Sequence, residues 1–114
     1  MTEIVTVEIN CPDPGTAWAI AEALVARRLA AAANVHPACE SLYRWRGRLE
    51  RATEVPLVLK TRAALFPALA AAARALHPYE TPSILARPVA AATDDYRAWI
   101  AAETAGIQSG RATP

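Results

Sequence analysis

Alternating apolar and polar positions open the chain and predict a strand followed by a helix. Residues 3–11, EIVTVEINC, alternate and are rich in β-branched side chains, which is the pattern of a half-buried strand. The sequence PDPG at 12–15 is typical of a turn. Residues 16–29 then place apolar side chains three and four positions apart, so we expect a helix with one buried face.

The middle of the chain predicts a long hairpin. Residues 34–45, NVHPACESLYRW, lead into residues 49–61, LERATEVPLVLKT, through the sequence RGR. Gly47 suits the tight turn between them, because glycine readily adopts the positive φ angles that such turns require. Pro56 cannot donate a hydrogen bond to a neighbouring strand, so we expect a bulge or an edge position there.

A second helix is predicted over residues 63–77. It should begin within residues 63–66, because Pro67 is tolerated only in the first turn of a helix. It should end at His77, because the residue that precedes a proline, here Pro78, is displaced from helical geometry.

The remainder of the chain predicts one more strand and one more helix. Residues 83–89, SILARPV, have the composition of a strand. Thr93 is suited to cap a helix that runs to residue 103, with two aspartates in its first turn. Residues 104–114 are polar and show no periodicity. We therefore expect one domain over residues 1–103 and a flexible C-terminal tail.

The order of these elements is two βαβ halves followed by a helix. Two such halves form an α+β ferredoxin-like sandwich, βαββαβ, in which one antiparallel sheet carries two helices on one face. The last helix is an addition at the C-terminal end of this fold.

Each arm of the predicted hairpin is longer than the helix that covers it. About 12 residues of strand span roughly 40 Å, whereas a helix of about 14 residues spans only about 21 Å. The end of the hairpin therefore projects, and it carries Leu42, Tyr43, Trp45 and Leu49. An apolar, unpaired strand end tends to associate with another chain. We expect a homo-oligomer with Leu42, Tyr43 and Trp45 in the subunit interface.

Charge and composition exclude several partners. The 114 residues have a net charge of +1, and the densest basic stretch, residues 44–51, is interrupted by Glu50. Nucleic-acid binding normally requires a basic stripe, so we expect none. Residues 1–10 lack the apolar core of a signal peptide, and no charge-free apolar run reaches membrane-spanning length. We therefore expect a cytoplasmic protein with no membrane partner and with two reduced cysteines.

Ferredoxin-like folds serve several functions, and the residues argue against three of them. A heavy-metal chaperone needs two thiolates in the loop after the first strand, where this chain has Cys11 alone. An RNA-recognition module needs aromatic side chains on its central strands, which are missing here. An acylphosphatase-like enzyme needs a cationic loop where this chain has Asp13. No nucleophile–base pair is apparent, so we predict that the protein is not an enzyme.

Three residues are candidates for a metal site. Cys11 ends a strand beside a helix N-terminus, which lowers the pKa of a thiol, although a lone cysteine is more often a small buried hydrophobe. His77 either offers an imidazole nitrogen to a ligand or complements the dipole at the end of its helix. Glu80 faces either the same site or solvent. Cys11 and His77 meet only if the predicted topology is correct.

Lys60 lies at the end of an apolar arm, in the sequence LVLKT. A buried ammonium group needs a partner, for which Glu54 and Glu80 are candidates. The alternative is that the lysine side chain extends along the sheet edge to solvent.

The motifs resemble those of one known family. Residues 29–61, LAAAANVHPACESLYRWRGRLERATEVPLVLKT, followed by HPYETPS at 77–83, are similar to the CutA divalent-cation tolerance proteins. The similarity extends from about residue 4 to about residue 100. The resemblance implies a ferredoxin-like subunit in a homotrimer with PII-like architecture, hairpins that pair across subunits, and a role in tolerance to divalent metals such as copper.

The resemblance also implies metal ligands, which this chain retains only in part. Cys11 matches the family's cysteine at the end of the first strand, and His77 matches the histidine of its HPY motif. The family's third ligand is a glutamate, and Ser83 stands in its position. Ala33 likewise occupies a position where many members have cysteine. Glu80 is the alternative third ligand, and otherwise binding should be weak.

Two functional hypotheses follow. The first is a cytoplasmic homotrimer that binds Cu(II) or another divalent cation weakly through Cys11, His77 and Glu80, with no required cofactor. The second is a PII-like binding module whose inter-subunit cleft holds a small anion or metabolite contacted by Trp45, Lys60 and Tyr79.

Overall fold

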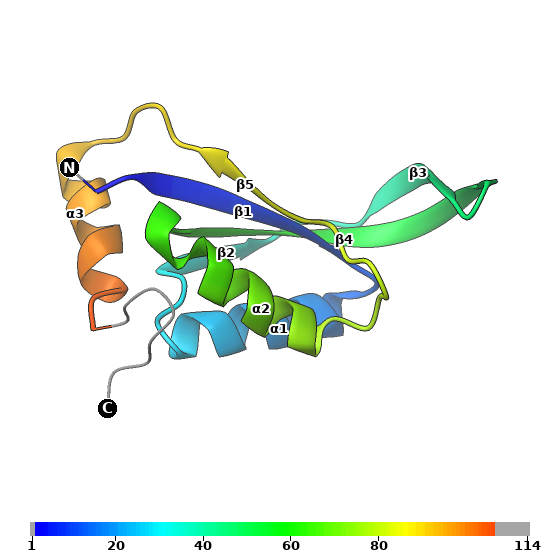
Figure 1. Ribbon diagram of the computed structural model, residues 1–114, viewed down its shortest axis with the longest axis horizontal. Coiled ribbons are helices and arrows are strands. Elements are labelled where there is room, and N and C mark those ends of the chain that lie inside the picture. Colours follow the sequence, from blue (N-terminus) through cyan, green and yellow to red (C-terminus); the bar gives the residue numbers. More distant parts are fainter. Residues whose placement is uncertain (1, 107–114) are drawn as a thin grey trace.

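Five strands form one antiparallel sheet in the computed structural model, which describes residues 2–106 of the chain (Figure 1). The strands are β1 (Ile4–Cys11), β2 (Ala32–Val35), β3 (Cys39–Trp45), β4 (Arg48–Arg62) and β5 (Ile84–Pro88). The helices are α1 (Pro14–Ala26), α2 (Phe66–Leu76) and α3 (Asp94–Glu103), with a 3-10 turn, η1 (Ala63–Leu65), before α2. The α+β class and the extra C-terminal helix are therefore as predicted.

The long strand β4 organises the sheet. The strand order is β2-β4-β1-β5, and β3 pairs with the outer half of β4. Helices α1 and α2 cover one face of this sheet (Figure 1). The side chains that point toward the helices are fully buried, because alternate residues of a strand face opposite sides of the sheet. They include Val7 and Ile9 on β1 and Leu57 and Leu59 on β4.

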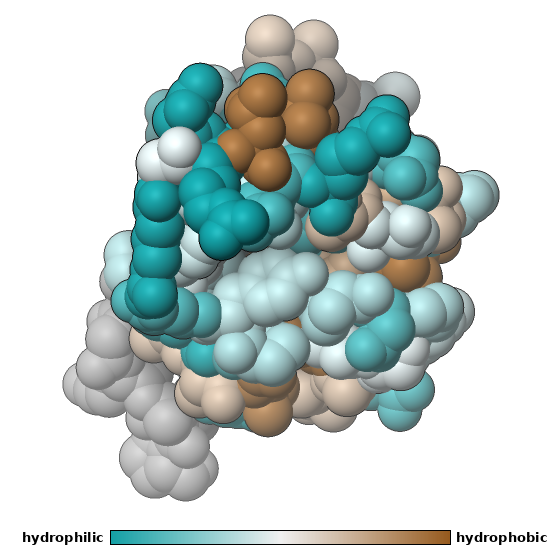
Figure 2. All heavy atoms as spheres, turned by 90° about the vertical axis from the view of Figure 1, so that its right-hand side faces the viewer, coloured by the Kyte–Doolittle hydropathy of each residue, from teal (hydrophilic) through white to brown (hydrophobic). Residues whose placement is uncertain are grey.

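The hairpin β3–β4 projects beyond both helices, as its length predicted (Figure 1). Its turn consists of Arg46 and Gly47, whose φ angles are 50° and 79°. Two consecutive positive φ angles define a type I′ turn, whose twist matches that of the two strands. Leu42 and Leu49 remain 68% and 65% exposed near this end. Figure 2, which looks onto this end of the molecule, shows apolar side chains surrounded by hydrophilic ones.

The first arm of the hairpin is not one continuous strand, which corrects the prediction of a single arm over 34–45. Val35 pairs with Leu57 and Cys39 with Glu54, so three residues of the first arm face two of β4. This extra residue lies across from Pro56, whose carbonyl accepts a hydrogen bond from the His36 amide at 2.9 Å. The irregularity expected at Pro56 therefore lies on the neighbouring chain segment.

The ends of helix α1 differ from the prediction of 16–29. The helix begins at Pro14 because the Asp13 carboxylate accepts a hydrogen bond from the Thr16 amide at 2.7 Å and caps it. The helix ends at Ala26. Two residues later Arg28 adopts a φ of 60°, and the Leu29 amide donates a hydrogen bond to the Leu24 carbonyl at 2.9 Å. Helices commonly end with a residue in this left-handed backbone conformation.

Helix α2 ends at Leu76, and His77 is its extended C-terminal cap with a ψ of 135°. Pro78 produces this stop as the sequence predicted, one residue earlier than the expected boundary. The 3-10 turn η1 occupies 63–65 and the helix itself begins at Phe66, which puts Pro67 in its first turn.

Helix α3 closes the end of the sheet opposite to the hairpin (Figure 1). Ile100 packs against Ile4 and Ala31 in a second, smaller apolar cluster. Thr104, where the sequence placed the start of the tail, is fully buried and bonded to the Arg62 guanidinium. The rest of the predicted tail, from residue 107 onward, lies outside the described residues. None of the helices found within residues 2–106 is both long enough and apolar enough to cross a bilayer.

Candidate functional site

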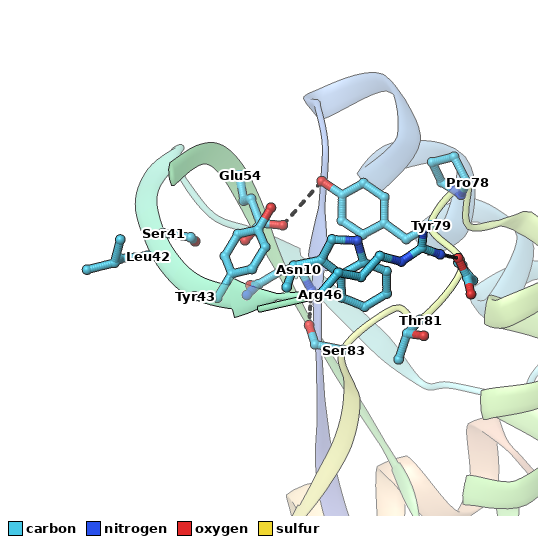
Figure 3. Close-up of a pocket in the computed structure, with 12 residues that line it drawn as sticks. Asn10, Ser41, Leu42, Tyr43, Arg46, Glu54, Pro78, Tyr79, Thr81 and Ser83 are labelled. Atoms are coloured by element: carbon cyan, nitrogen blue, oxygen red, sulfur yellow. Dashed lines mark hydrogen bonds and ion pairs between the residues drawn. The ribbon is translucent and has the colours of Figure 1, made fainter. Parts of the chain in front are cut away.

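A cavity of about 690 Å³ lies between the projecting hairpin and the segment that joins α2 to β5. The hairpin contributes Ser41, Leu42, Tyr43, Trp45, Arg46 and Glu54, and the joining segment contributes Pro78, Tyr79, Glu80, Thr81 and Ser83, with Asn10 from β1. Figure 3 shows the lining side chains, which come from the hairpin, from the end of β1 and from the segment after α2. The cavity exists because the hairpin outruns the helices while the stop after α2 turns the chain back toward the end of β1.

His77 lies next to the end of β1, as the topology argument anticipated. Its Nε2 atom is 2.8 Å from the Asn10 carbonyl oxygen, and its Nδ1 atom accepts a hydrogen bond from the Tyr79 amide at 3.2 Å. A carbonyl only accepts, so Nε2 carries the proton, and the neutral tautomer satisfies both nitrogens. The residue as a whole is 7% exposed. Binding a metal through His77 would require one of these two hydrogen bonds to break.

Cys11 is fully buried in the main core, which agrees with its interpretation as a small hydrophobe. Burial, together with the negative charges of Asp13 and Glu54, raises the pKa of the Cys11 thiol to about 11. The alternative expectation, a thiol whose pKa is lowered by the start of α1, is therefore wrong. Desolvation of the thiolate is the largest cause of this shift in pKa.

Ser83 reaches the same strand end from the other side. Its Oγ atom accepts a hydrogen bond from the Asn10 amide at 3.3 Å (Figure 3). The three positions that the family resemblance identified, Cys11, His77 and Ser83, thus converge on residues 10 and 11. Only two of them carry metal-binding side chains. Among the described residues, no group of three His, Cys, Asp or Glu side chains is placed to hold a metal ion.

Glu80 is not placed as a third metal ligand beside Cys11 and His77. Its carboxylate is 2.6 Å from the Arg46 guanidinium at the hairpin turn, and both side chains are 68% exposed. The Arg46 guanidinium also lies 5.2 Å from the centre of the Trp45 ring. Arg46 therefore links the hairpin turn to the segment after α2, with Glu80 as its ionic partner.

Glu54 is a buried acidic residue of the cavity lining that the sequence did not identify as part of a site. It is 6% exposed, and one of its carboxylate oxygens accepts a hydrogen bond from the Tyr79 hydroxyl at 3.2 Å (Figure 3). Burial of the phenol, followed by the charge of Glu54 and this hydrogen bond, raises the pKa of Tyr79 to about 12. An acidic residue directly before the buried run VPLVL was the available signal, because carboxylates are seldom buried without a role.

Lys60 lies outside this cavity. It pairs with Thr6 in the middle of β1, and its ammonium group donates to the Asn34 side-chain oxygen at 2.7 Å. Its partner is thus Asn34 and neither of the two glutamates proposed from the sequence. Of the three residues assigned to a ligand cleft, Trp45 and Tyr79 line the cavity and Lys60 does not.

Comparison with known proteins identifies the family. Residues 5–103 match the model of the family described as CutA1 divalent ion tolerance protein. The divalent-cation tolerance protein CutA of Thermus thermophilus is 39% identical over 104 residues, which cover 91% of this chain and 99% of that protein. The mouse protein CutA is 38% identical over 107 residues, or 93% of this chain. The chain spans only 60% of the mouse protein's length and 55% of the human one.

Solved structures agree with this result. The CutA crystal structure from Xylella fastidiosa superposes with a TM-score of 0.86 at 36% identity, covering 89% of this chain and 97% of that one. The Thermus thermophilus structure gives a TM-score of 0.81 at 41% identity, covering 88% and 95%. An Archaeoglobus fulgidus relative with a TM-score of 0.86 at 31% identity, over 89% of this chain and 98% of its own, is described as periplasmic.

The family match covers every strand and helix of the described fold, apart from the first residue of β1. The matched family is one of tolerance proteins and not of enzymes, as the sequence predicted. From these matches, and from the fold and motifs described above, the chain belongs to the CutA1 divalent ion tolerance protein family.

Proposed function

We propose that this chain acts in tolerance to divalent metal ions as a homotrimer, with weak metal binding near the end of β1. Family membership is the observation that carries the proposal. The exposed apolar end of the hairpin supports the oligomer, because Leu42 and Leu49 remain 68% and 65% exposed in the subunit. Cys11 and His77 support metal binding, since His77 bonds to the carbonyl of Asn10, the residue directly before Cys11 in β1.

The same geometry explains why binding should be weak. A metal binds the thiolate of cysteine, and the Cys11 thiol has a pKa of about 11. At pH 7 the thiolate fraction is then on the order of 10⁻⁴, so the apparent affinity falls by a similar factor relative to a free thiolate. Binding through His77 also costs one of its two hydrogen bonds. Affinity should rise about tenfold per pH unit, because one thiol proton is released on binding.

Calorimetric titration with Cu(II) and with Zn(II) tests this proposal. The variant Cys11→Ser with His77→Gln should abolish the binding seen in the wild type. The chain supplies a matched control, because Cys39→Ser with His36→Gln removes the other cysteine and the other histidine. Zn(II) is included because, unlike Cu(II), it does not oxidise thiols. Binding that is equal in the two double variants would show that Cys11 and His77 are not the ligands.

A gain-of-function variant sharpens the test. Ser83→Glu introduces a carboxylate at the third position of the family pattern, next to Asn10. It should tighten metal binding by at least about tenfold, since a third ligand that is anionic adds to both charge and coordination number. Unchanged affinity in this variant would count against a site at this strand end.

The proposal includes a cytoplasmic location for the protein. The two free cysteines, Cys11 and Cys39, agree with a reducing compartment such as the cytoplasm. Fractionation of cells that express the untagged protein would test this, and recovery in an extracytoplasmic fraction would contradict it.

The cavity favours a second candidate function, a PII-like trimer that binds a small ligand at a cleft formed with the help of the hairpin. Its support is the volume of about 690 Å³ and the presence of both Trp45 and Tyr79 among the lining residues. Cavities of roughly 300–1,000 Å³ are typical of small-molecule sites. Melting temperatures measured against a panel of metabolites would detect such a ligand, and a panel without any shift would argue against it.

A further inference from the structure

The projecting hairpin β3–β4 has two faces of different chemistry. Residues that lie directly opposite one another on paired strands point to the same side, and successive residues of a strand alternate between the two sides. One side, the aromatic face, consists of Cys39, Ser41, Tyr43, Trp45, Arg48, Glu50, Ala52 and Glu54. The other side, the leucine face, consists of Glu40, Leu42, Arg44, Leu49, Arg51 and Thr53.

Both faces are exposed in a single subunit. Leu42 and Leu49 on the leucine face are 68% and 65% exposed. Tyr43 and Trp45 on the aromatic face are 41% and 38% exposed. Figure 3 shows the Leu42 side chain pointing away from Tyr43. One neighbouring subunit that covers one side of this ribbon therefore leaves the other side uncovered.

We propose that the leucine face of each hairpin packs on the aromatic face of the next subunit's hairpin, with Arg51 of one subunit paired to Glu50 of its neighbour. This packing rests on the homotrimer proposed above and specifies which surfaces meet in it. Each hairpin then contacts both neighbours, one through each face.

The leucine face carries an excess of positive charge. Arg44 and Arg51 are exposed, and neither forms an ion pair within residues 2–106. Glu40, the one acid on this face, accepts a hydrogen bond from the Thr53 hydroxyl at 2.8 Å. The two leucines are thus flanked by two guanidinium groups that have no ionic partner in their own subunit.

The aromatic face carries an excess of negative charge. Glu50 and Glu54 lie on it with Arg48 as the one basic residue. Neither carboxylate forms an ion pair within the described part of the chain. Glu54 is 6% exposed and accepts a hydrogen bond from the Tyr79 hydroxyl at 3.2 Å. A buried carboxylate is stabilised by a positive charge nearby, which the leucine face of a neighbour supplies.

The remaining groups of the two faces also fit one another. Leucine side chains bury apolar area against aromatic rings, and the faces of such rings attract guanidinium groups. Within the subunit, the Arg46 guanidinium already lies 5.2 Å from the centre of the Trp45 ring. Arg46 is paired with Glu80 at 2.6 Å, so it does not neutralise the carboxylates of the aromatic face.

Contact between two unlike faces closes readily into a ring. A surface that meets a different surface of the next copy generates a closed ring or an open filament, and a ring of three leaves neither face exposed. When the hairpins project in one direction around a three-fold axis, equal positions lie at equal heights. Arg51 pairs with Leu42 and Glu50 with Tyr43, so the two charges differ in height by about 3.3 Å. Packing of leucine face on leucine face would instead bring arginines together.

An exchange of two adjacent residues tests this packing. Glu50→Arg and Arg51→Glu each place like charges across the contact. The dissociation constant of the trimer, measured by light scattering on dilution at a fixed urea concentration, should rise about tenfold or more in each. The double variant Glu50→Arg with Arg51→Glu has the composition of the wild type and restores opposite charges, so most of the affinity should return. The losses should shrink at about 1 M salt, which screens exposed charges.

Glu22→Arg is the matched control, because Glu22 is exposed on α1 and the charge changes as in Glu50→Arg. It should leave the dissociation constant unchanged. Circular dichroism spectra report whether each variant is folded, and recovery in the double variant excludes misfolding as the cause of the losses.

The outcomes separate this packing from the homotrimer itself. A monomeric wild type would contradict both. A trimeric wild type whose dissociation constant is unchanged in the two single variants would overturn the packing and leave the homotrimer standing. Tighter association of Arg51→Glu would indicate that leucine faces pack on one another, which also overturns it. Losses in both single variants without recovery in the double variant would refute the pairing of Arg51 with Glu50.

Discussion

At the level of single residues, burial decides how the side chains near the end of β1 behave. Cys11 and His77 are the two metal-binding residues that the sequence offered, and both are less than a tenth exposed. The thiol is protonated at neutral pH, and the imidazole makes two hydrogen bonds within the subunit. A metal would reach these two side chains only by displacing a proton and a hydrogen bond.

The raised pKa of Cys11 predicts a loss of stability at alkaline pH. The pKa rises from 9.0 to about 11 on folding, so the folded protein holds the proton more tightly than the unfolded chain. This contribution is complete below pH 9.0 and is lost as the pH rises from there to about 11. It amounts to at most about 2.7 kcal/mol, at about 1.36 kcal/mol per unit of pKa.

Urea unfolding of the wild type and of Cys11→Ala at neutral pH and above pH 10 tests this prediction. The stability advantage of the wild type over the variant should shrink as the pH rises. A constant advantage over Cys11→Ala would show that the thiol titrates normally. Tyr79 titrates over a higher range, up to about 12, and affects both proteins alike.

The buried hydrogen bond of Thr61 should contribute measurably to the free energy of unfolding. Its side chain is fully buried and donates to the Leu29 carbonyl at 2.7 Å, which fixes the segment after α1 against β4. Thr61→Val keeps the volume but leaves that carbonyl unsatisfied, so the free energy of unfolding should fall by about 1–3 kcal/mol. Thr53→Val, which removes an exposed bond to Glu40, is the control and should change stability by less than about 0.5 kcal/mol. Equal effects in the two variants would contradict this account.

At the level of elements, arginine side chains hold the C-terminal end of α3 in place. The Arg62 guanidinium donates to the Thr104 hydroxyl and to its carbonyl, both at 2.8 Å. Arg28 donates to the Glu103 carbonyl at 2.9 Å. Cations at this end satisfy carbonyls that have no partner within a helix and complement the helix dipole. The short helix α3 thus depends on residues of β4 and of the segment after α1.

Removal of the Arg62 side chain should loosen α3. Arg62→Ala leaves buried groups of Thr104 without these donors, so we expect a loss of about 1–3 kcal/mol in unfolding free energy. Amide exchange within Asp94–Glu103 should accelerate more than exchange in β1. Arg87→Ala, which removes an exposed pairing with Glu8, is the control. Uniform acceleration over the whole chain would indicate global destabilisation and not a local role at α3.

At the level of the whole molecule, the hairpin is the element whose apolar side chains a single subunit leaves exposed. Leu42 and Leu49 lie diagonally opposite on one face of the hairpin, because Leu42 pairs with Arg51 and Arg44 with Leu49. An exposed apolar face at the end of a two-stranded ribbon has little stability by itself. Assembly with other subunits would cover it, which is the physical reason for the proposed homotrimer.

Charged substitutions on this face should disrupt assembly. Leu42→Lys with Leu49→Lys places like charges in the proposed interface, so light scattering should show a mass below that of three chains. Trp18→Lys is the control, since Trp18 is 53% exposed on α1, away from the hairpin. A wild type that is monomeric would contradict the trimer, and a double variant that remains trimeric would exclude this face from the interface.

The sequence by itself determined the order of the elements, their class and the family. Period-two and period-3.6 patterns, Gly47 at the hairpin turn and Pro78 at the stop of α2 are local signals, so they can be read without tertiary contacts. The motifs within residues 29–61, followed by HPYETPS at 77–83, identified the family in the same way. The projecting hairpin also followed from strand and helix lengths alone.

Only the tertiary structure decided which side chains meet and how they ionise. Glu54 became a buried partner of Tyr79, Glu80 was engaged by Arg46, and Lys60 paired with Asn34. The break in the first hairpin arm arose opposite Pro56, in a different segment from the proline itself. Burial and distances between residues far apart in the chain set these outcomes, because desolvation and charge–charge interactions depend on the folded environment and not on spacing in the sequence.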